Sequence, residues 1–345
     1  MAGTDRPPNT RTARLAFTGD LLLGRKVSAT VVNGQPPTAM WGDLRPRMLA
    51  ADAVIANLET PITTHAVKWH KWKAFYFRTD PVITESLKAG NIQCLSLANN
   101  HMVDYGSQGL LDTRRHLDAA GIAFAGAGAN ADEAAKPVLF EAGQMTIGFI
   151  SITNTVPAFR ATADHPGTNY WKITTDRATI DRLAAHIGDL RTAGADLVIL
   201  STHWGPNYRW WPPRHYRAFA RKAVDLGVDI VHGHSAHVLQ AVEFHGRGLI
   251  LYDTGDFVED MIVAPGFRSD RSCLFLVEAG PGMVPRLRMV PVKLTLAKVN
   301  RARGREADAI REYMMRRCRG FAVDIREENG ELIATPPAGA GREDG

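Results

Sequence analysis

Short apolar runs alternate with longer amphipathic stretches along most of the chain. The apolar runs close in polar residues, as in RLAFTGD, AVIANLE, QCLSLANNH, MTIGFISITN, DLVILSTHWG, DIVHGH and LILYDTGD. The stretches between many of them have helical spacing and close in glycine, as in SQGLLDTRRHLDAAG and HYRAFARKAVDLG. This alternation predicts an α/β layered fold, in which ligands gather where strands end.

The pattern changes toward the C-terminus. Residues 272–297 alternate around a glycine-proline turn and predict a β-hairpin, and a helix over about residues 304–319 follows. The sequence shows no internal repeat or linker, so we expect one domain over 14–320 after a flexible N-terminus at 1–13. Residues 321–345 are expected to be a C-terminal extension whose end, TPPAGAGREDG, has the composition of disorder.

Composition and charge exclude several classes of protein. The chain of 345 residues is 45% hydrophobic and 22% charged, as in ordinary globular enzymes. A net charge of +5 without a basic run gives no indication of nucleic-acid binding. Asp20 interrupts the first apolar stretch before it could serve as a signal-peptide core, and no segment has the length of a membrane span. We therefore expect a cytoplasmic protein without a membrane anchor. Its three scattered cysteines are expected to be buried, reduced thiols.

Polar side chains that suit a metal ion follow successive predicted strands. In chain order they are Asp20, Glu59, Asn100, His101, His203, His234 and His237. One histidine near a strand is more often structural, but a series of this kind indicates a convergent site. Carboxylate, amide and imidazole groups together suit Zn²⁺, Mn²⁺ or Fe²⁺, and Ca²⁺ or Mg²⁺ if oxygen ligands dominate. One or two ions fit this pattern.

Six segments in order resemble the motifs of the CapA family, named for a poly-γ-glutamate capsule protein. They are TGDLLLG, ANLETPIT, LANNHMVDYG, THWGPNY, VHGHSAHVLQAVE and LYDTGDF, and the resemblance covers about residues 14 to 295. The family is similar in fold to the calcineurin-type metallophosphatases. The resemblance implies a layered α/β/β/α sandwich with a metal site at the C-terminal ends of strands.

The resemblance also implies roles for the polar residues. The implied metal ligands are Asp20, Glu59, Asn100, His203, His234 and His237. Glu59 takes the place where phosphatases usually have a bridging aspartate. His101 resembles the acid/base histidine beside the metal, and Asp104 lies near enough in sequence to orient its imidazole.

Two departures from the phosphatase pattern leave one metal position poorer in ligands. Leu22 stands where phosphatases usually carry a histidine, and Ala236 in GHSAH adds a residue between the last two candidate histidines. Asp253 and Asp256 could supply a missing carboxylate or a base. Their alternative role is a tight turn after a strand.

Two segments, 67–81 and 203–217, combine cationic side chains with five of the seven tryptophans. Packing is one interpretation of such clusters. The other is a substrate-binding surface, in which cationic groups meet carboxylates and aromatic rings hold a peptide. The candidate substrate-binding residues are Lys71, Lys73, Arg78, Trp204 and Arg209.

Three functions remain open at this stage. The first is metal-assisted hydrolysis of a phosphoester, with His101 protonating the leaving oxygen. The second is proton transfer at Cα of a peptide, with His101 and Asp256 as the pair. It follows from the resemblance, because CapA-like proteins include epimerases of ribosomally made precursors such as lasso peptides. The third is a non-catalytic component of poly-γ-glutamate or capsule synthesis. The missing phosphatase ligands favour the second hypothesis, with a peptide or poly-glutamate-like substrate.

Overall fold

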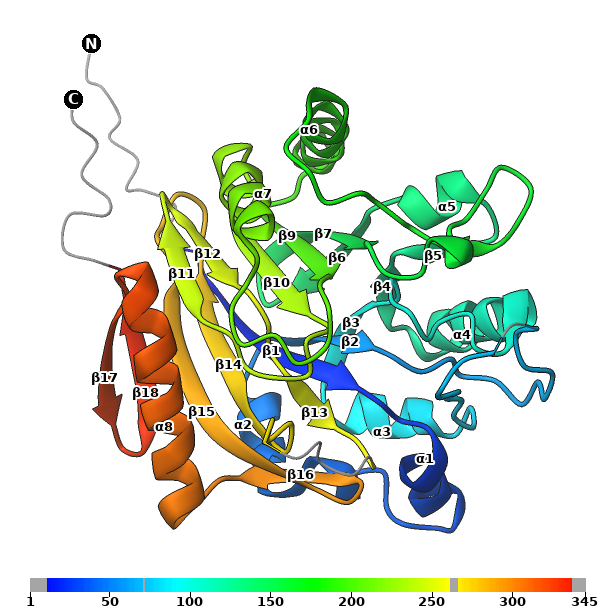
Figure 1. The fold of residues 1–345 in the computed structure, drawn as a ribbon, viewed down its shortest axis with the longest axis horizontal. Coiled ribbons are helices and arrows are strands. Elements are labelled where there is room, and N and C mark those ends of the chain that lie inside the picture. The colour runs from blue at the N-terminus through cyan, green and yellow to red at the C-terminus, as the bar shows by residue number, and fades with distance from the viewer. Residues whose placement is uncertain (1–10, 71, 261–265, 337–345) are drawn as a thin grey trace.

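The fold is a four-layered sandwich of two sheets with helices on their outer faces. The computed structural model describes residues 11–70, 72–260 and 266–336. Figure 1 shows α1–α4 outside the larger sheet and α6 and α7 outside the smaller one. The predicted α/β/β/α fold class is confirmed.

The larger sheet contains ten strands. Their order is β17-β18-β15-β14-β1-β2-β3-β4, with β13 beside β1 and β16 beside β15. The strands β1 to β4 and β13 run parallel, whereas β14 runs antiparallel to β1. Their bounds are β1 (Ala13–Leu21), β2 (Ala53–Leu58), β3 (Ile92–Ser96), β4 (Ala123–Ala125), β13 (Asp256–Val258), β14 (Arg271–Ala279), β15 (Arg286–Thr295), β16 (Lys298–Arg301), β17 (Asp324–Glu328) and β18 (Glu331–Thr335).

The smaller sheet contains six strands in the order β11-β12-β10-β9-β7-β6. Its four inner strands are parallel, and an antiparallel strand closes each edge. Their bounds are β6 (Val138–Ala142), β7 (Met145–Thr153), β9 (Leu197–His203), β10 (Ile230–His234), β11 (Val242–His245) and β12 (Gly248–Leu251). The short strands β5 (Ala127–Gly128) and β8 (Gly167–Thr168) pair separately.

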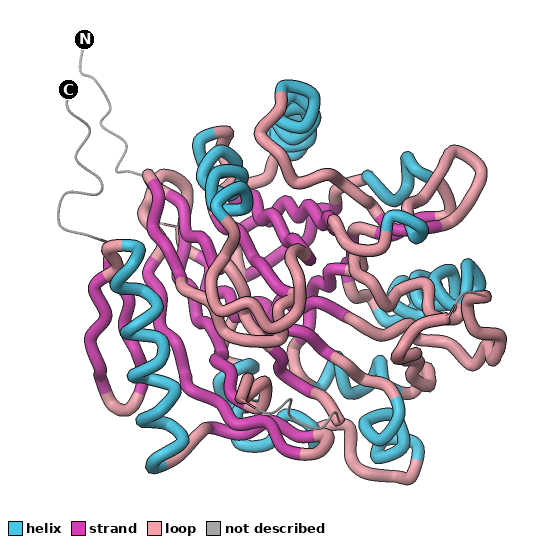
Figure 2. The backbone as a smooth tube through the Cα atoms, in the orientation of Figure 1, coloured by secondary structure: helices cyan, strands magenta, loops and turns pink. Residues whose placement is uncertain are grey.

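Helices cover both outer faces, as Figure 2 shows with the helices in cyan and the strands in magenta. The helices are α1 (Arg25–Val32), α2 (Arg45–Leu49), α3 (Ile83–Ala89), α4 (Gly106–Ala120), α5 (Ala131–Ala135), α6 (Arg177–Thr192), α7 (Arg214–Asp225) and α8 (Gly304–Cys318), with 3₁₀ turns at Ala39–Leu44, Pro157–Phe159 and Arg319–Phe321. The helix α8 differs from those on the outer faces, because its buried residues join the hydrophobic cluster between the sheets. One hydrophobic cluster joins the facing sides of the two sheets, and a second lies beneath α1–α4. Burying each large apolar side chain in these clusters contributes about 1.5–3 kcal/mol.

The C-terminal elements match the sequence prediction and extend it. The hairpin of β14 and β15 and the helix α8 are confirmed. The expected extension contributes a further hairpin, because β18 pairs with β15 and β17 pairs with β18. The N-terminal residues 1–10 and the tail 337–345 lie outside the described residues, and the division into domains stays a prediction.

The parallel strands carry the polar residues to one edge of each sheet. At this edge β1 and β13 approach closely, and Asp20 lies in register with Asp256. A Cβ at Gly19 would lie 1.7 Å from the carbonyl oxygen of Gly255, so only glycine permits this approach. The close approach brings two aspartates together that are far apart in the chain.

Candidate metal centre

The candidate ligands meet where five strands end. Asp20 is the next-to-last residue of β1, Glu59 directly follows β2, and Asn100 lies in the loop after β3. His203 and His234 are the last residues of β9 and β10. Strands of the larger sheet therefore supply the oxygen groups, and strands of the smaller sheet supply imidazoles.

A first group of ligand atoms joins the two sheets. Asp20, His203 and His234 offer atoms that all lie within 4.8 Å of one another. The Nδ1 atoms of the two histidines are 2.9 Å apart, and His234 Nδ1 is 3.6 Å from Asp20 Oδ1. Asn100 Oδ1 lies 2.5 Å from His203 Nε2. The structure thus brings the predicted amide group to the same cluster.

A second group shares the same aspartate. Asp20, Glu59 and His237 also offer atoms within 4.8 Å of one another. His237 Nδ1 lies 3.5 Å from Asp20 Oδ2 and 2.8 Å from Asp256 Oδ1. Asp256 therefore lies beside this second group, in contact with its histidine. A shared carboxylate suits two neighbouring ions, as well as a single one.

The electrostatics of these residues fit a divalent cation. Both carboxylate oxygens of Glu59 are buried and have no hydrogen-bond partner within the described part of the chain. Burial raises the pKa of Glu59 well above its ordinary value and raises that of Asp20 to about 7. Burial also lowers the pKa values of His203 and His234 well below the ordinary value, which keeps the imidazoles neutral. Neutral imidazoles beside the unpartnered carboxylate of Glu59 form a donor set that a divalent ion would satisfy.

His101 is held by a buried carboxylate beside this cluster. Its Nδ1 lies 2.7 Å from Asp104 Oδ2, which also accepts the backbone N–H of Phe77 at 2.8 Å. The Lys73 ammonium pairs with the other oxygen of Asp104. His101 Nε2 lies 3.8 Å from Glu59 Oε1. Burial lowers the pKa of His101. Asp104 therefore fixes a neutral imidazole whose second nitrogen faces the cluster.

A small cavity of about 140 Å³ opens beside the cluster. Its titratable lining residues are His101, Tyr208, His237, Asp256 and Glu259, and its apolar walls include Leu22, Phe75 and Phe77. Burial raises the pKa of Asp256 well above its ordinary value and raises that of Glu259 to about 9. A neutral imidazole and protonated carboxyl groups therefore face one enclosed space.

The predicted substrate-binding residues have different surroundings. Lys73 lies at the site, but its ammonium is bound to Asp104 and to the carbonyl of Asn100. Arg78 donates to the carbonyls of Thr64 and His65 and lines a separate pocket. Arg209 is exposed, and Lys71 lies outside the described residues. Lys73 is thus a positioning group for Asp104 rather than a free cation.

The prediction that Trp204 contacts substrate is wrong. Only 3% of this residue is exposed, and its ring stacks on Tyr216 at 5.1 Å between centroids. Its indole N–H donates to the carbonyl of Tyr252. Because His203 faces the cluster and side chains alternate along a strand, Trp204 faces the core instead.

Sequence reasoning missed three residues of the site. Asn57 donates to Asp20 Oδ1 at 2.7 Å and accepts a bond from Asn99, which also accepts the N–H of His101. Glu259 lines the cavity. A signal was present for Asn57, because an amide within the otherwise apolar strand β2 must find a buried partner. Glu259 directly follows β13, three positions after Asp256. No periodicity in the loop that begins there indicates where the Glu259 side chain points.

None of the described helices is both long and apolar enough to cross a membrane.

Comparisons with known proteins identify a family for this chain. A probable polyglutamine synthesis accessory protein of Mycobacterium tuberculosis is 31% identical over 324 residues, covering 89% of this chain and 85% of the relative. The capsule biosynthesis protein CapA of Bacillus anthracis is 29% identical over 249 residues, covering 71% of this chain and 59% of that protein. The PGA biosynthesis protein CapA of Bacillus subtilis is also 29% identical over 249 residues, which cover 63% of its length. The family model described as bacterial capsule synthesis protein PGA_cap matches residues 14–261, so the chain belongs to this CapA-type family.

Proposed function

We propose that this chain is a divalent-metal-dependent enzyme that inverts Cα centres in a peptide or poly-glutamate-like substrate. The observation that carries the proposal is the enclosed cavity, which places His101 and Asp256 beside one candidate metal cluster. His101 lies in the loop after β3, and Asp256 is the first residue of β13. Because the strand order is β3-β2-β1-β13, the two residues approach from opposite sides of the β1–β2 pair. A Cα atom held between them would meet a proton-transfer group on each face.

The proton steps use the residues as the structure holds them. A divalent ion bound by the cluster would polarise a substrate carbonyl and so make the neighbouring Cα–H more acidic. His101, with its Nδ1 fixed by Asp104, removes or returns the proton at Nε2. The carboxyl group of Asp256 acts from the other face. One C–H bond breaks and another forms, so the only net change is the configuration.

The names of the relatives support the proposed substrate class. Their names refer to polyglutamine, PGA and capsule synthesis. We therefore propose a glutamate-containing chain as the substrate, with a ribosomally made precursor peptide as the form that a peptide epimerase would take. Apolar walls at Leu22, Phe75 and Phe77 would exclude water around the reacting carbon.

Phosphoester hydrolysis is the second candidate. The observation in its favour is that both ligand groups share Asp20, the arrangement that a two-ion hydrolytic site requires. In that reaction His101 would protonate the leaving oxygen. Leu22 and the longer spacing between His234 and His237 weigh against it.

The test follows solvent deuterium into candidate peptides. Metal-loaded protein is incubated with glutamate-containing peptides in D₂O, and mass shift and chiral amino-acid analysis are read beside a phosphoester assay. Deuterium at Cα with inverted configuration supports the proposal. Ester cleavage without exchange identifies a phosphoesterase. If neither activity is detected, the remaining candidate is a non-catalytic role in capsule or polyglutamate synthesis.

A pair of variants separates chemistry from folding. His101→Ala is expected to abolish exchange while the metal content stays unchanged, because His101 contacts the cavity and not the paired imidazoles. His165→Ala is the matched control, since the His165 side chain is 74% exposed in a distant loop. Loss of metal from well-folded His101→Ala protein would contradict the role assigned to this residue.

A further inference from the structure

A second pocket, of about 290 Å³, lies against α8 and carries aromatic rings together with guanidinium groups. Its lining includes the aromatic residues Trp210, Phe267 and Tyr313 and the arginines Arg268, Arg316 and Arg317. Aromatic and arginine side chains of this kind recognise anionic groups attached to apolar or planar ones. No part of the proposed acid/base mechanism uses this pocket.

The pocket has a surplus of positive charge. Arg268 pairs with Asp270 and with Glu306, both at 2.9 Å. Arg316 and Arg317 differ, because no carboxylate of the described residues lies within ion-pair distance of either one. The buried Nε of Arg317 has no hydrogen-bond partner among those residues. Two guanidinium groups are therefore available to an anionic ligand.

Aromatic rings hold Arg317 in place. Its guanidinium carbon lies 4.8 Å from the ring centroids of Trp211 and Tyr313 and 5.2 Å from that of Trp210. Cation–π contacts orient the group without neutralising its charge. A carboxylate that enters the pocket would meet an ordered guanidinium, so little side-chain entropy would be lost on binding.

The pocket adjoins the candidate metal centre. Phe267, a wall of the pocket, packs against Tyr208, a wall of the small cavity, with ring centroids 4.6 Å apart. His237 belongs to the metal cluster, and the next residue, Val238, lines the pocket. The Tyr313 hydroxyl donates to the carbonyl of Leu239 at 2.8 Å, which ties α8 to this loop. The pocket and the small cavity are therefore neighbours, and the packed rings of Tyr208 and Phe267 stand between them.

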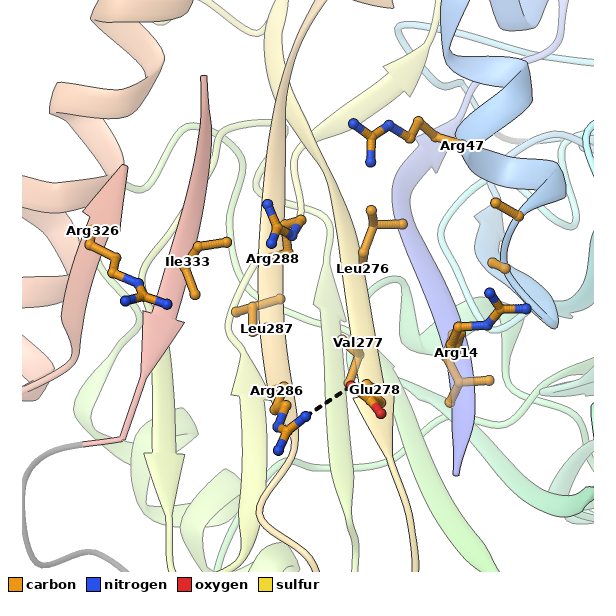
Figure 3. A pocket seen from close by; sticks show the side chains of 13 residues that line it. Arg14, Arg47, Leu276, Val277, Glu278, Arg286, Leu287, Arg288, Arg326 and Ile333 are labelled. Carbon is orange, nitrogen blue, oxygen red and sulfur yellow. Dashed lines mark hydrogen bonds and ion pairs between the residues drawn. The ribbon is translucent and has the colours of Figure 1, made fainter. Parts of the chain in front are cut away.

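A larger groove on the outer face of the ten-stranded sheet is a weaker candidate. It has a volume of about 560 Å³, and Figure 3 shows five arginines around it. Each guanidinium already has a carboxylate partner, as in the pair of Arg286 and Glu278 drawn in Figure 3. The others are Arg14 with Asp52, Arg47 with Glu331, Arg288 with Glu328 and Glu331, and Arg326 with Glu328. Every arginine of this surface is therefore paired with a carboxylate, unlike Arg316 and Arg317 in the pocket at α8.

We propose that the pocket at α8 binds a side-chain carboxylate of the substrate, one or more residues away from the reacting carbon. Arg316 and Arg317 supply charge-assisted hydrogen bonds to the carboxylate, and the rings of Trp210 and Phe267 contact its methylene groups. The inference rests on the proposed function for its substrate class, a glutamate-containing chain. It adds a binding site that selects acidic over neutral residues.

The experiment measures binding separately from turnover. Full-length, metal-loaded protein is titrated with an acetylated and amidated glutamate hexapeptide and with the matching glutamine hexapeptide, and affinity is read by calorimetry. The glutamate peptide is expected to bind at least tenfold more tightly, because charge-assisted bonds contribute on the order of one to two decades of affinity. Added salt is expected to reduce this preference, since the pocket is open to solvent.

Variants on one helix provide the matched comparison. Arg317→Gln is expected to weaken glutamate-peptide binding roughly tenfold or more, and Arg317→Lys to retain part of it. Arg305→Gln removes the same charge from an exposed position of α8 outside the pocket and is expected to bind as wild type does. Circular dichroism and thermal unfolding verify that each variant is folded. Equal affinity of Arg317→Gln and Arg305→Gln, or of the two peptides, would overturn the proposal.

Failure of the pocket and failure of the proposed function give different results. If Cα exchange occurs and Arg317→Gln leaves KM unchanged, the pocket does not bind substrate although the reaction stands. If the glutamate peptide binds in an Arg317-dependent manner and no exchange occurs, the pocket stands and the proposed reaction fails.

Discussion

Replacing Glu59 by glutamine is expected to stabilise the metal-free protein and to weaken its response to metal. The residue has no exposed surface, and neither of its carboxylate oxygens has a partner among the described residues. Burial is the main reason why the pKa of Glu59 is raised, and the neighbouring carboxylates of Asp20 and Asp256 raise it further. Glutamine keeps the shape of the side chain and removes the charge.

The magnitude follows from the unpartnered oxygens. A buried polar group without a partner costs about 1–3 kcal/mol, and glutamine keeps a polar amide, so we expect a gain of about 1–2 kcal/mol. For a chain of 345 residues this gain corresponds to roughly 1–3 °C in Tm. In the presence of metal the order reverses, because the wild-type carboxylate supplies a charged ligand that the amide does not.

The effect should depend on pH with a definite sign. Because the pKa of Glu59 is higher in the folded than in the unfolded metal-free chain, the folded state binds more protons above pH 4.5. The stabilising contribution of the Glu59 carboxyl group is complete below the pKa that Glu59 has in the unfolded chain, and it is lost as the pH rises through the pKa of the folded state. The difference between the Glu59→Gln variant and wild type is therefore expected to be small at pH 5 and larger at pH 8.

Urea unfolding of both proteins, in EDTA and in excess Mn²⁺ or Zn²⁺, measures these differences. Gln35→Glu serves as a control for handling, since position 35 is exposed. The reasoning is refuted if metal-free Glu59→Gln protein is less stable than wild type at pH 8. It is also refuted if metal stabilises the two proteins equally.

Three further variants probe the surroundings of the site. Asn100→Ala is expected to lower metal affinity roughly 10- to 100-fold, as measured by metal titration, because its amide oxygen lies 2.5 Å from His203 Nε2; unchanged affinity would remove it from the ligand set. Lys73→Met is expected to lower kcat roughly tenfold at unchanged metal content, because it releases one oxygen of Asp104; an unchanged kcat would contradict this positioning role. Gly19→Ala is expected to lose more than about 3 kcal/mol of stability in urea, since its Cβ would lie 1.7 Å from a backbone oxygen, and wild-type stability would show that β1 and β13 can separate.

The alternation of apolar runs and amphipathic stretches was sufficient to predict the layered fold, because buried parallel strands are apolar on both faces. It also predicted where the polar groups lie, since parallel strands end at a common edge. It left open which of the two later aspartates, Asp253 or Asp256, lies beside the candidate ligands. That depends on the pairing of β1 with β13, which brings Asp256 beside Asp20 across more than 230 residues of sequence.

Two features of the structure had signals in the sequence. Trp204 directly follows His203, the last residue of β9, so its side chain is expected to face away from that of a metal-facing histidine and into the core. The hairpin of β17 and β18 turns at Asn329 and Gly330, which both have positive φ. An Asn-Gly pair between β-forming segments is a strong hairpin signal, and it lies within the segment that we expected to be an extension.

The division of ligands between the sheets links metal binding to the fold. Asp20 and Glu59 belong to strands of the larger sheet, whereas His203 and His234 end strands of the smaller sheet. The facing sides of the sheets are otherwise joined by a hydrophobic cluster, which is non-directional and tolerates small shifts. Ion coordination has fixed distances, so a bound ion would set the spacing of the sheets at this edge. The cavity lined by His101 and Asp256 lies beside this junction, and both residues come from the larger sheet, one after β3 and the other in β13.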